Sequence, residues 1–257
     1  MNPLLTVENA CFSYGDKIAV EGLNFNLQPR DYLCIVGENG SGKTTLLNGI
    51  LRLKHTHDGR ILYSEELQRT QIGYLPQQHS IHSTFPASVL EVVLSGRLGH
   101  KGQSPFYTRQ DRAMAREALA MVGAEELEHQ WFGGLSGGQC QRVLLARALS
   151  TAPDGLKLLI LDEPMSGLDP HGRIVLYELI KLLNSEKGIT VVMVTHDVNT
   201  ATHFANRILL LATQQLFFGT PDEFEATELG RNLMRDACGG HCAICGFSHL
   251  PEGELYA

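Results

Sequence analysis

One loop constrains the possible fold of this chain more than any other feature. Its sequence, Gly37-Glu38-Asn39-Gly40-Ser41-Gly42-Lys43-Thr44, fits the pattern G-x-x-x-x-G-K-[S/T] at every fixed position. Residues 32–36 before it form an apolar run typical of a buried strand, and residues 45–51 after it place apolar side chains at helical spacing. A strand, a glycine-rich loop and a helix in this order predict a loop that binds phosphate groups.

The residue types of the loop suit a nucleotide. Backbone N–H groups of a glycine-rich loop can surround a polyphosphate, and the helix N-terminus adds partial positive charge. Lys43 is expected to reach the β- and γ-phosphates, and Thr44 to coordinate Mg²⁺. The alternative, a glycine turn that only caps a helix, does not account for Lys and Thr in register. We therefore expect ATP or GTP to contact Gly37, Glu38, Asn39, Gly40, Ser41, Gly42, Lys43, Thr44 and Thr45.

Composition narrows the class of protein. A length of 257 residues suits one large α/β domain or a domain with a small appendage. The net charge of −7 and the lack of long Lys or Arg runs argue against nucleic acid as a main partner. No apolar stretch approaches the length of a membrane span, and the N-terminus lacks the features of a signal peptide. We expect the chain itself to be soluble and cytoplasmic.

The order of apolar patterns predicts the architecture. The first thirty residues alternate apolar and polar side chains, as antiparallel strands do, whereas residues 74–150 show helical spacing and suggest a helical insertion. Strand patterns return at residues 158–161, 189–194 and 208–211, and Asp169 and Pro170 mark the start of a helix between them. Buried strands alternating with helices predict a parallel, doubly wound sheet whose ligand lies at the carboxyl ends of the strands.

An acidic pair follows one of these strands. Asp162 and Glu163 come directly after four apolar residues, so both carboxylates are expected at the exit of a buried strand. Beside a phosphate-binding loop, Asp162 would hold Mg²⁺ and Glu163 would accept a proton from an attacking water. Taken alone, such a pair would only end a strand and begin a turn.

A third motif, Leu135-Ser136-Gly137-Gly138-Gln139, precedes a helix. Ser136 and two glycines at a helix N-terminus make a second surface suited to anions. Together with Lys43 and the acidic pair, in this order, the motif resembles the signature of the ATPase subunits of ABC transporters, and the resemblance runs from about residue 4 to residue 224.

This resemblance implies a fold and an assembly. The fold is α/β, an ABC-type P-loop ATPase with a RecA-like parallel sheet core, N-terminal antiparallel strands and an inserted helical subdomain at about residues 78–150. The domain would span residues 1–235. In the family, two subunits sandwich two ATP molecules, so the signature of one subunit would face the phosphate loop of its partner.

Four further roles follow only from the resemblance. Gln77 matches a glutamine that touches Mg²⁺ or the lytic water, and His196 matches a histidine that contacts the γ-phosphate. Asp169 lies in a loop that crosses the dimer interface, and Tyr14 matches a ring that stacks on adenine. The plainer alternatives are a surface Gln, an ordinary His, and an edge-strand packing role for Tyr14.

Two positions depart from the family pattern. Cys140 follows the signature where a polar or charged residue is usual, and a thiol at a helix N-terminus can have a lowered pKa. A tolerated small residue is the simpler interpretation. Met165 replaces the usual Thr after the acidic pair and Pro164. Neither change removes a catalytic group.

Residues 85–97 hint at the cargo. This segment resembles the permease-contacting segment of zinc and manganese importer ATPases, and iron-siderophore and cobalamin importers have similar segments. The resemblance implies the ATP-hydrolysing subunit of a transition-metal importer, with zinc first and manganese or an iron chelate as alternatives. A homodimer would act beneath two permease subunits, on the cytoplasmic face of the membrane, and would depend indirectly on an extracytoplasmic metal-binding protein.

The end of the chain carries separate chemistry. Among six cysteines, Cys11, Cys34 and Cys140 are scattered, as reduced and mostly buried residues would be. The tail, residues 236–257, has five metal-ligand candidates with a C-x-x-C spacing, which predict a Zn²⁺ site that senses cytoplasmic metal. An incidental cluster or a redox-active pair would be the alternative. The five residues are Cys238, His241, Cys242, Cys245 and His249.

Two other functions remain open from the sequence. A soluble ABC ATPase, for example one serving iron–sulfur assembly, would carry the same nucleotide motifs without a permease. A metal-binding regulatory protein would use the tail, and its ATPase would be secondary.

Overall fold

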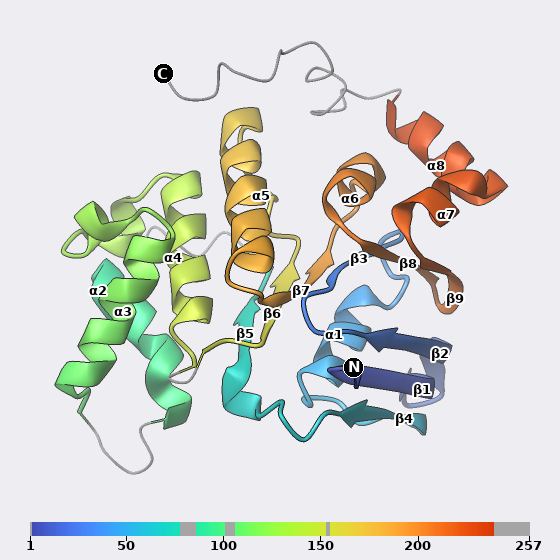
Figure 1. The fold of residues 1–257 in the computed structure, drawn as a ribbon, viewed down its shortest axis with the longest axis horizontal. Helices are drawn as coiled ribbons and strands as arrows, with labels where there is room; N and C mark the ends of the chain where they lie inside the picture. The colour runs from blue at the N-terminus through green and yellow to red at the C-terminus, as the bar shows by residue number, and fades with distance from the viewer. Residues whose placement is uncertain (1, 78–85, 101–105, 153–154, 239–257) are drawn as a thin grey trace.

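The computed structural model describes residues 2–77, 86–100, 106–152 and 155–238, and its centre is a sheet. Within these residues nine strands pair in the order β4-β1-β2-β9-β8-β3-β7-β6-β5 (Figure 1). The strands are β1 (Leu5–Tyr14), β2 (Lys17–Leu27), β3 (Tyr32–Val36), β4 (Asp58–Tyr63), β5 (Ile72–Leu75), β6 (Leu158–Asp162), β7 (Thr190–Val194), β8 (Arg207–Ala212) and β9 (Gln214–Gly219).

The parallel part of the sheet confirms the predicted fold class. Strand β3 pairs in parallel with β7 and β8, and β6 pairs in parallel with β5 and β7. Every residue of β3, β6 and β7 is buried, as expected for strands covered on both faces. Alternate residues of β3 enter two separate apolar cores, with Cys34 in one and Ile35 in the other. The carboxyl ends of these strands share one edge.

The predicted N-terminal antiparallel strands are also present. β1 pairs antiparallel with β2 and with β4. The sequence pattern missed β4 and β9, because their residues are mostly exposed or half-buried and carry no apolar run. It also began the helical insertion too early, since Tyr74 and Leu75 belong to β5 and pair with β6. A run of four apolar residues is too short to separate strand from helix by periodicity.

The helices begin where the sequence offers capping residues. Asp169 accepts a hydrogen bond from the Gly172 N–H at 2.7 Å and begins α5, as predicted. Ser88, Thr108 and Ser136 begin α2, α3 and α4 with reciprocal capping boxes. The helices are α1 (Lys43–Ile50), α2 (Val89–Ser95), α3 (Arg109–Met121), α4 (Gly137–Leu149), α5 (Pro170–Ser185), α6 (Val198–Phe204), α7 (Pro221–Ala226) and α8 (Glu228–Cys238).

Helices α2, α3 and α4 form a group of their own beside β5, at one end of the sheet (Figure 1). This group matches the helical insertion expected between the glycine loop and the acidic pair. None of the helices in the described ranges is both long enough and apolar enough to span a bilayer.

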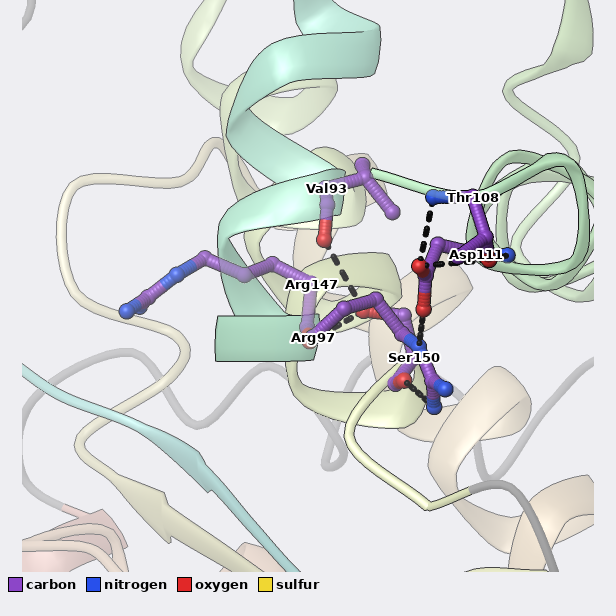
Figure 2. Close-up of polar contacts among 6 residues, drawn as sticks. All are labelled: Val93, Arg97, Thr108, Asp111, Arg147 and Ser150. Atoms are coloured by element: carbon purple, nitrogen blue, oxygen red, sulfur yellow. Dashed lines mark hydrogen bonds and ion pairs between the residues drawn. The ribbon is translucent and has the colours of Figure 1, made fainter. Parts of the chain in front are cut away.

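A buried polar network joins the three helices of this group (Figure 2). Arg97, in a short 3-10 helix after α2 (Gly96–His100), donates to Asp111 Oδ1 at 3.0 Å and to the Ser150 carbonyl at 3.1 Å. The Ser150 hydroxyl lies 2.9 Å from the Val93 carbonyl. Asp111 also accepts from the backbone and hydroxyl of Thr108. The network therefore fixes the C-terminal end of α4, whose N-terminal end carries Ser136.

Candidate nucleotide-binding site

A cavity of about 500 Å³ opens at the edge where the parallel strands end. It gathers residues from the glycine loop, the β1–β2 turn, the end of β5 and the end of β6, which are far apart in the sequence. The lining residues are Tyr14, Lys17, Ile18, Ala19, Asn39, Gly40, Gly42, Lys43, Thr44, Thr45, Gln77, Glu163, Val194 and Thr213.

Most predicted nucleotide residues are brought together here, and a few lie outside the lining. Gly37, Glu38 and Ser41 belong to the loop but do not line the cavity. No pattern in the sequence pointed to Lys17 or Thr213. Thr213 reaches the site because its N–H donates to the Ser41 carbonyl at 3.0 Å, a contact created by the β8–β9 turn.

Two glycines of the loop are required by close packing. A Cβ at Gly37 would lie 2.1 Å from the Leu211 carbonyl oxygen. A Cβ at Gly42 would lie 2.3 Å from Val20 Cγ2, and Gly42 also has a φ of +98°. Both distances are far below van der Waals contact, so only glycine lets the loop follow this path.

The loop holds its lysine in place. Lys43 Nζ donates to the carbonyls of Gly37 and Glu38 at 2.8 and 2.7 Å. Burial lowers the pKa of Lys43, and the charges of Glu163 and Asp162 oppose that shift. The ammonium is therefore already positioned in the loop with two carboxylates near it.

The site fits a polyphosphate with Mg²⁺. Ser41 Oγ is buried in the loop without a hydrogen-bond partner, an arrangement that a ligand oxygen would satisfy. Thr44 offers an exposed hydroxyl, and Asp162 offers a carboxylate at the end of β6. Burial raises the pKa of Tyr74 to about 12, and the negative charge of Asp162 adds to the shift. Hydroxyl and carboxylate oxygens are ligands that Mg²⁺ prefers.

Glu163 lies among the other predicted catalytic residues. Gln77 Nε2 donates to Glu163 Oε2 at 3.0 Å, and His196 Nδ1 lies 3.9 Å from the same oxygen. The Glu163 side chain is 15% exposed, whereas that of His196 is 72% exposed. Glu163 also has a φ of +46°, which is a strained value for a residue other than glycine. Strained backbone angles of this kind are common at functional sites. The carboxylate is thus aimed by its own backbone and by Gln77.

The signature lies apart from this cavity. Ser136 Oγ accepts from the Gln139 N–H at 3.3 Å, and Gln139 Oε1 accepts from the Ser136 N–H at 3.0 Å. A second cavity, of about 390 Å³, is lined by Ser136, Gly138 and Gln139 together with residues of α5. No described signature residue lines the cavity around Lys43.

Comparison with known proteins gives the family. The profile of the family described as ABC transporter matches residues 20–166, more than half of the chain, and a profile of an AAA domain matches residues 132–201. The chain belongs to the ABC transporter family. The expected resemblance, α/β fold and ATPase activity are therefore confirmed.

Individual relatives extend over nearly the whole ABC ATPase chain. The manganese transport system ATP-binding protein MntB of Bacillus subtilis is 38% identical over 251 residues, 96% of this chain and 97% of MntB. The zinc uptake system ATP-binding protein ZurA of Listeria innocua is 35% identical, covering 91% of this chain and 92% of ZurA. A solved inward-facing ABC transporter, provisionally assigned to the metal-chelate type, has a TM-score of 0.80 at 34% identity, covering 91% and 90% of the two chains.

The position of Tyr14 in this ABC ATPase argues against a packing role. The ring lines the cavity around Lys43 and is 55% exposed. Lys54 Nζ lies 3.6 Å from the ring centroid, close enough for a cation–π contact. An edge-strand tyrosine that served the core would be covered by apolar side chains instead.

The departures from the family pattern also have plain explanations. Cys140 is buried, and burial raises its pKa, so the interpretation as a thiol with a lowered pKa is wrong. Cys140 acts as a small core residue, as does Met165, which is buried in the same core. Cys11, Cys34 and Cys140 are all unpaired thiols, as predicted.

The predicted metal site of the tail lies outside the part that can be described. Cys238 is the last residue of α8, and only its backbone is described. The other four residues, His241, Cys242, Cys245 and His249, lie outside the described residues. Where side chains are described, no group of three His, Cys, Asp or Glu residues could hold a metal. The Zn²⁺ site stays a prediction.

Proposed function

We propose that this ABC ATPase binds ATP in the cavity around Lys43 and uses ATP hydrolysis to drive uptake of a transition metal. Zinc and manganese are the first candidates for the cargo, and an iron chelate is the next. The observation that carries the hydrolytic part is the hydrogen bond from Gln77 to Glu163 beside the phosphate loop. The cargo is supported by relatives named for zinc and manganese transport and by the resemblance of residues 85–97.

Each residue has a distinct task. The backbone of the loop and Lys43 would hold the β- and γ-phosphates, because N–H groups and an ammonium complement their charge. Glu163 would accept a proton from the attacking water, and Gln77 keeps that carboxylate in position. His196 lies 3.9 Å from the same carboxylate and would contact the γ-phosphate, the role that the family resemblance implies. Mg²⁺, held by Thr44 and Asp162, would neutralise developing phosphate charge.

A homodimer would complete the site. The loop cavity and the signature cavity are separate in one chain, so neither alone surrounds a triphosphate. A head-to-tail pair would place Ser136 of one subunit over the phosphates bound by the other, and Asp169 near the interface. Permease subunits would then hold the dimer at the cytoplasmic face of the membrane, with an extracytoplasmic metal-binding protein supplying the cargo.

The test is uptake in cells that carry Glu163→Gln in place of the wild-type chain. We would measure zinc, manganese and siderophore-bound iron separately, with exposed Glu125→Gln as the matched control. Loss of uptake of one metal, with the other two unchanged, supports the proposal and identifies the cargo. Unchanged uptake of all three metals contradicts the proposal and favours the soluble, non-transport alternative. The names of the relatives do not support that alternative.

The tail is a second, separable part of the proposal. If residues 236–257 sense metal, a chain ending at residue 235 will bind less zinc and its ATPase rate will no longer respond to zinc. An unchanged zinc content and an unchanged response contradict the sensor hypothesis. They leave the ATPase assignment intact.

A further inference from the structure

A third cavity, lined by basic side chains, lies between the C-terminal end of α1 and the outer strand β4 and has a volume of about 560 Å³. We call it the basic pocket and define it by Arg52, Lys54, His55, Arg60 and Arg69. No carboxylate is among its lining residues, which also include Gly49, Thr56, Ile61, Leu62 and Tyr63. Arg and Lys side chains gathered around a cavity that has no carboxylate in its lining favour an anionic ligand.

Arg52 is held in this pocket by an unusual backbone. It follows α1 with a φ of +59°, a region that favours glycine or asparagine. Its guanidinium carbon lies 3.8 Å from the ring centroid of Tyr63, and the Tyr63 hydroxyl is anchored on the Gly49 and Ile50 carbonyls at 3.1 and 3.0 Å. Arg52 Nε is buried and has no hydrogen-bond partner. A ligand oxygen would satisfy it.

The other cations of the pocket are also poorly neutralised. Arg60 pairs with Glu8 at 2.7 Å, but both side chains are exposed and the pair is weak. Across the described ranges, no carboxylate forms an ion pair with Arg52, Lys54 or Arg69. Burial raises the pKa of Tyr63, and the charges of Arg52 and Arg69 oppose that shift.

Lys54 joins this pocket to the nucleotide cavity. It lines the basic pocket, while its ammonium contacts the ring of Tyr14, which lines the cavity around Lys43. A cation–π contact at an exposed site is weak, whereas a charge-assisted hydrogen bond from an ammonium to a phosphate oxygen is stronger. An anion in the basic pocket would therefore attract Lys54 away from the ring.

We propose that the basic pocket binds a soluble phosphate-bearing anion, and that the bound anion draws Lys54 off Tyr14. The consequence for ATP rests on the proposed stacking of adenine on Tyr14. If the ring loses its contact with Lys54, ATP affinity should change by about two- to five-fold, the range expected for one exposed cation–π contact. By linkage, ATP would change the affinity for the anion by the same factor.

The binding test uses pyrophosphate and the full-length chain with Lys43→Ala, so that the nucleotide loop does not compete. Calorimetry should show one saturable site. Arg52→Asn, which suits a positive φ, and Arg69→Gln should each weaken binding at least about ten-fold, since a hydrogen bond to a charged group is lost. Arg112→Gln, an equal charge change on exposed α3, should not. Absence of a saturable site, or equal binding by all variants, overturns the proposal.

A spectroscopic test addresses Lys54 without using ATP. In the Lys43→Ala chain labelled with ¹³C-tyrosine, the ring signal of Tyr14, assigned through Tyr14→Phe, should shift when pyrophosphate binds. Lys54→Met should remove the shift. An unchanged Tyr14 signal in the saturated protein overturns the link to the nucleotide cavity. Failure of the adenine-stacking role would instead appear as normal ATP affinity in Tyr14→Ala, with pyrophosphate binding retained.

A lipid headgroup offers the same phosphate chemistry, so one arm uses phosphatidylglycerol vesicles. The proposal expects pyrophosphate to bind and the vesicles to leave the chain in solution. If the vesicles capture the chain through Arg52 while pyrophosphate does not bind, the soluble ligand is contradicted and a membrane contact replaces it.

Discussion

Gln77 donates its side-chain N–H to Glu163 Oε2 at 3.0 Å, joining two residues that are 86 positions apart. Each follows a strand of the parallel sheet, Gln77 after β5 and Glu163 after β6, and these strands are hydrogen-bonded neighbours. The pairing of the two strands therefore brings an amide to a carboxylate that already lies beside the phosphate loop.

Replacing Glu163 by Gln should remove the proton acceptor and keep the shape of the site. We expect ATP to bind with affinity close to that of the wild type, while turnover falls about 10²- to 10⁴-fold, the usual contribution of a positioned base. Single-turnover hydrolysis and nucleotide binding would be measured on the same samples. Glu125→Gln is the exposed control, and normal turnover in Glu163→Gln would show that another group is the base.

Ser136 caps the N-terminus of α4 and, in the proposed dimer, contacts the γ-phosphate of the ATP bound by the partner. One substitution can separate these two functions. Asp is as good an N-cap as Ser, so Ser136→Asp should leave the denaturation midpoint nearly unchanged. Its negative charge would repel the γ-phosphate of the partner's ATP, so ATP-dependent dimerisation and turnover should be lost. Thr220→Asp, at the matching cap of α7, is the control. Full activity in Ser136→Asp would contradict a phosphate contact.

Tyr14→Ala should weaken ATP binding with little effect on stability, because the ring is more than half exposed. Stacking of a base on an aromatic ring contributes about 1–3 kcal/mol, which corresponds to roughly a 5- to 150-fold rise in Kd. Tyr14→Phe should restore the affinity. Trp131→Ala removes an equally exposed ring from the helical group and should change nothing. Equal Kd values for Tyr14→Ala and the wild type would rule out adenine stacking.

Breaking the ion pair between Arg97 and Asp111 should strongly destabilise the helical group. Both side chains are at most 10% exposed, so Arg97→Met leaves a buried carboxylate without its partner. We expect a loss of about 3–5 kcal/mol in unfolding free energy. The double variant Arg97→Met with Asp111→Leu should recover most of it. Arg116→Met, which breaks the exposed pair with Glu128, should cost less than about 1 kcal/mol.

Asp111 should also make stability depend on pH. Burial raises the pKa of Asp111, but hydrogen bonds from Thr108 and the Arg97 guanidinium outweigh it, and the net pKa lies below the usual value. A depressed pKa stabilises the fold above the unfolded pKa of about 3.9, and this stabilisation is lost as pH falls through the folded pKa. The free-energy difference between wild type and Asp111→Asn should therefore be constant near neutral pH and shrink below about pH 4. A difference that does not change over this range would contradict the assignment.

The sequence alone determined the features that depend on neighbouring residues. Residues 37–44 specify a phosphate loop because glycine conformation and the positions of Lys43 and Thr44 are local properties. The capping residue Asp169 and the apolar runs of β3, β6 and β7 likewise predicted element starts and buried strands.

Only the tertiary structure decided which distant groups meet. Strand pairing brings Gln77 next to Glu163, and packing in the apolar core buries Cys140 and so raises its pKa, although this thiol lies in the first turn of α4. The contact of Lys54 with Tyr14 and the buried pair of Arg97 with Asp111 have no sequence signal at all. A charge in a sequence does not reveal its solvation or its partner, because both depend on the packing of segments that are far apart in the chain.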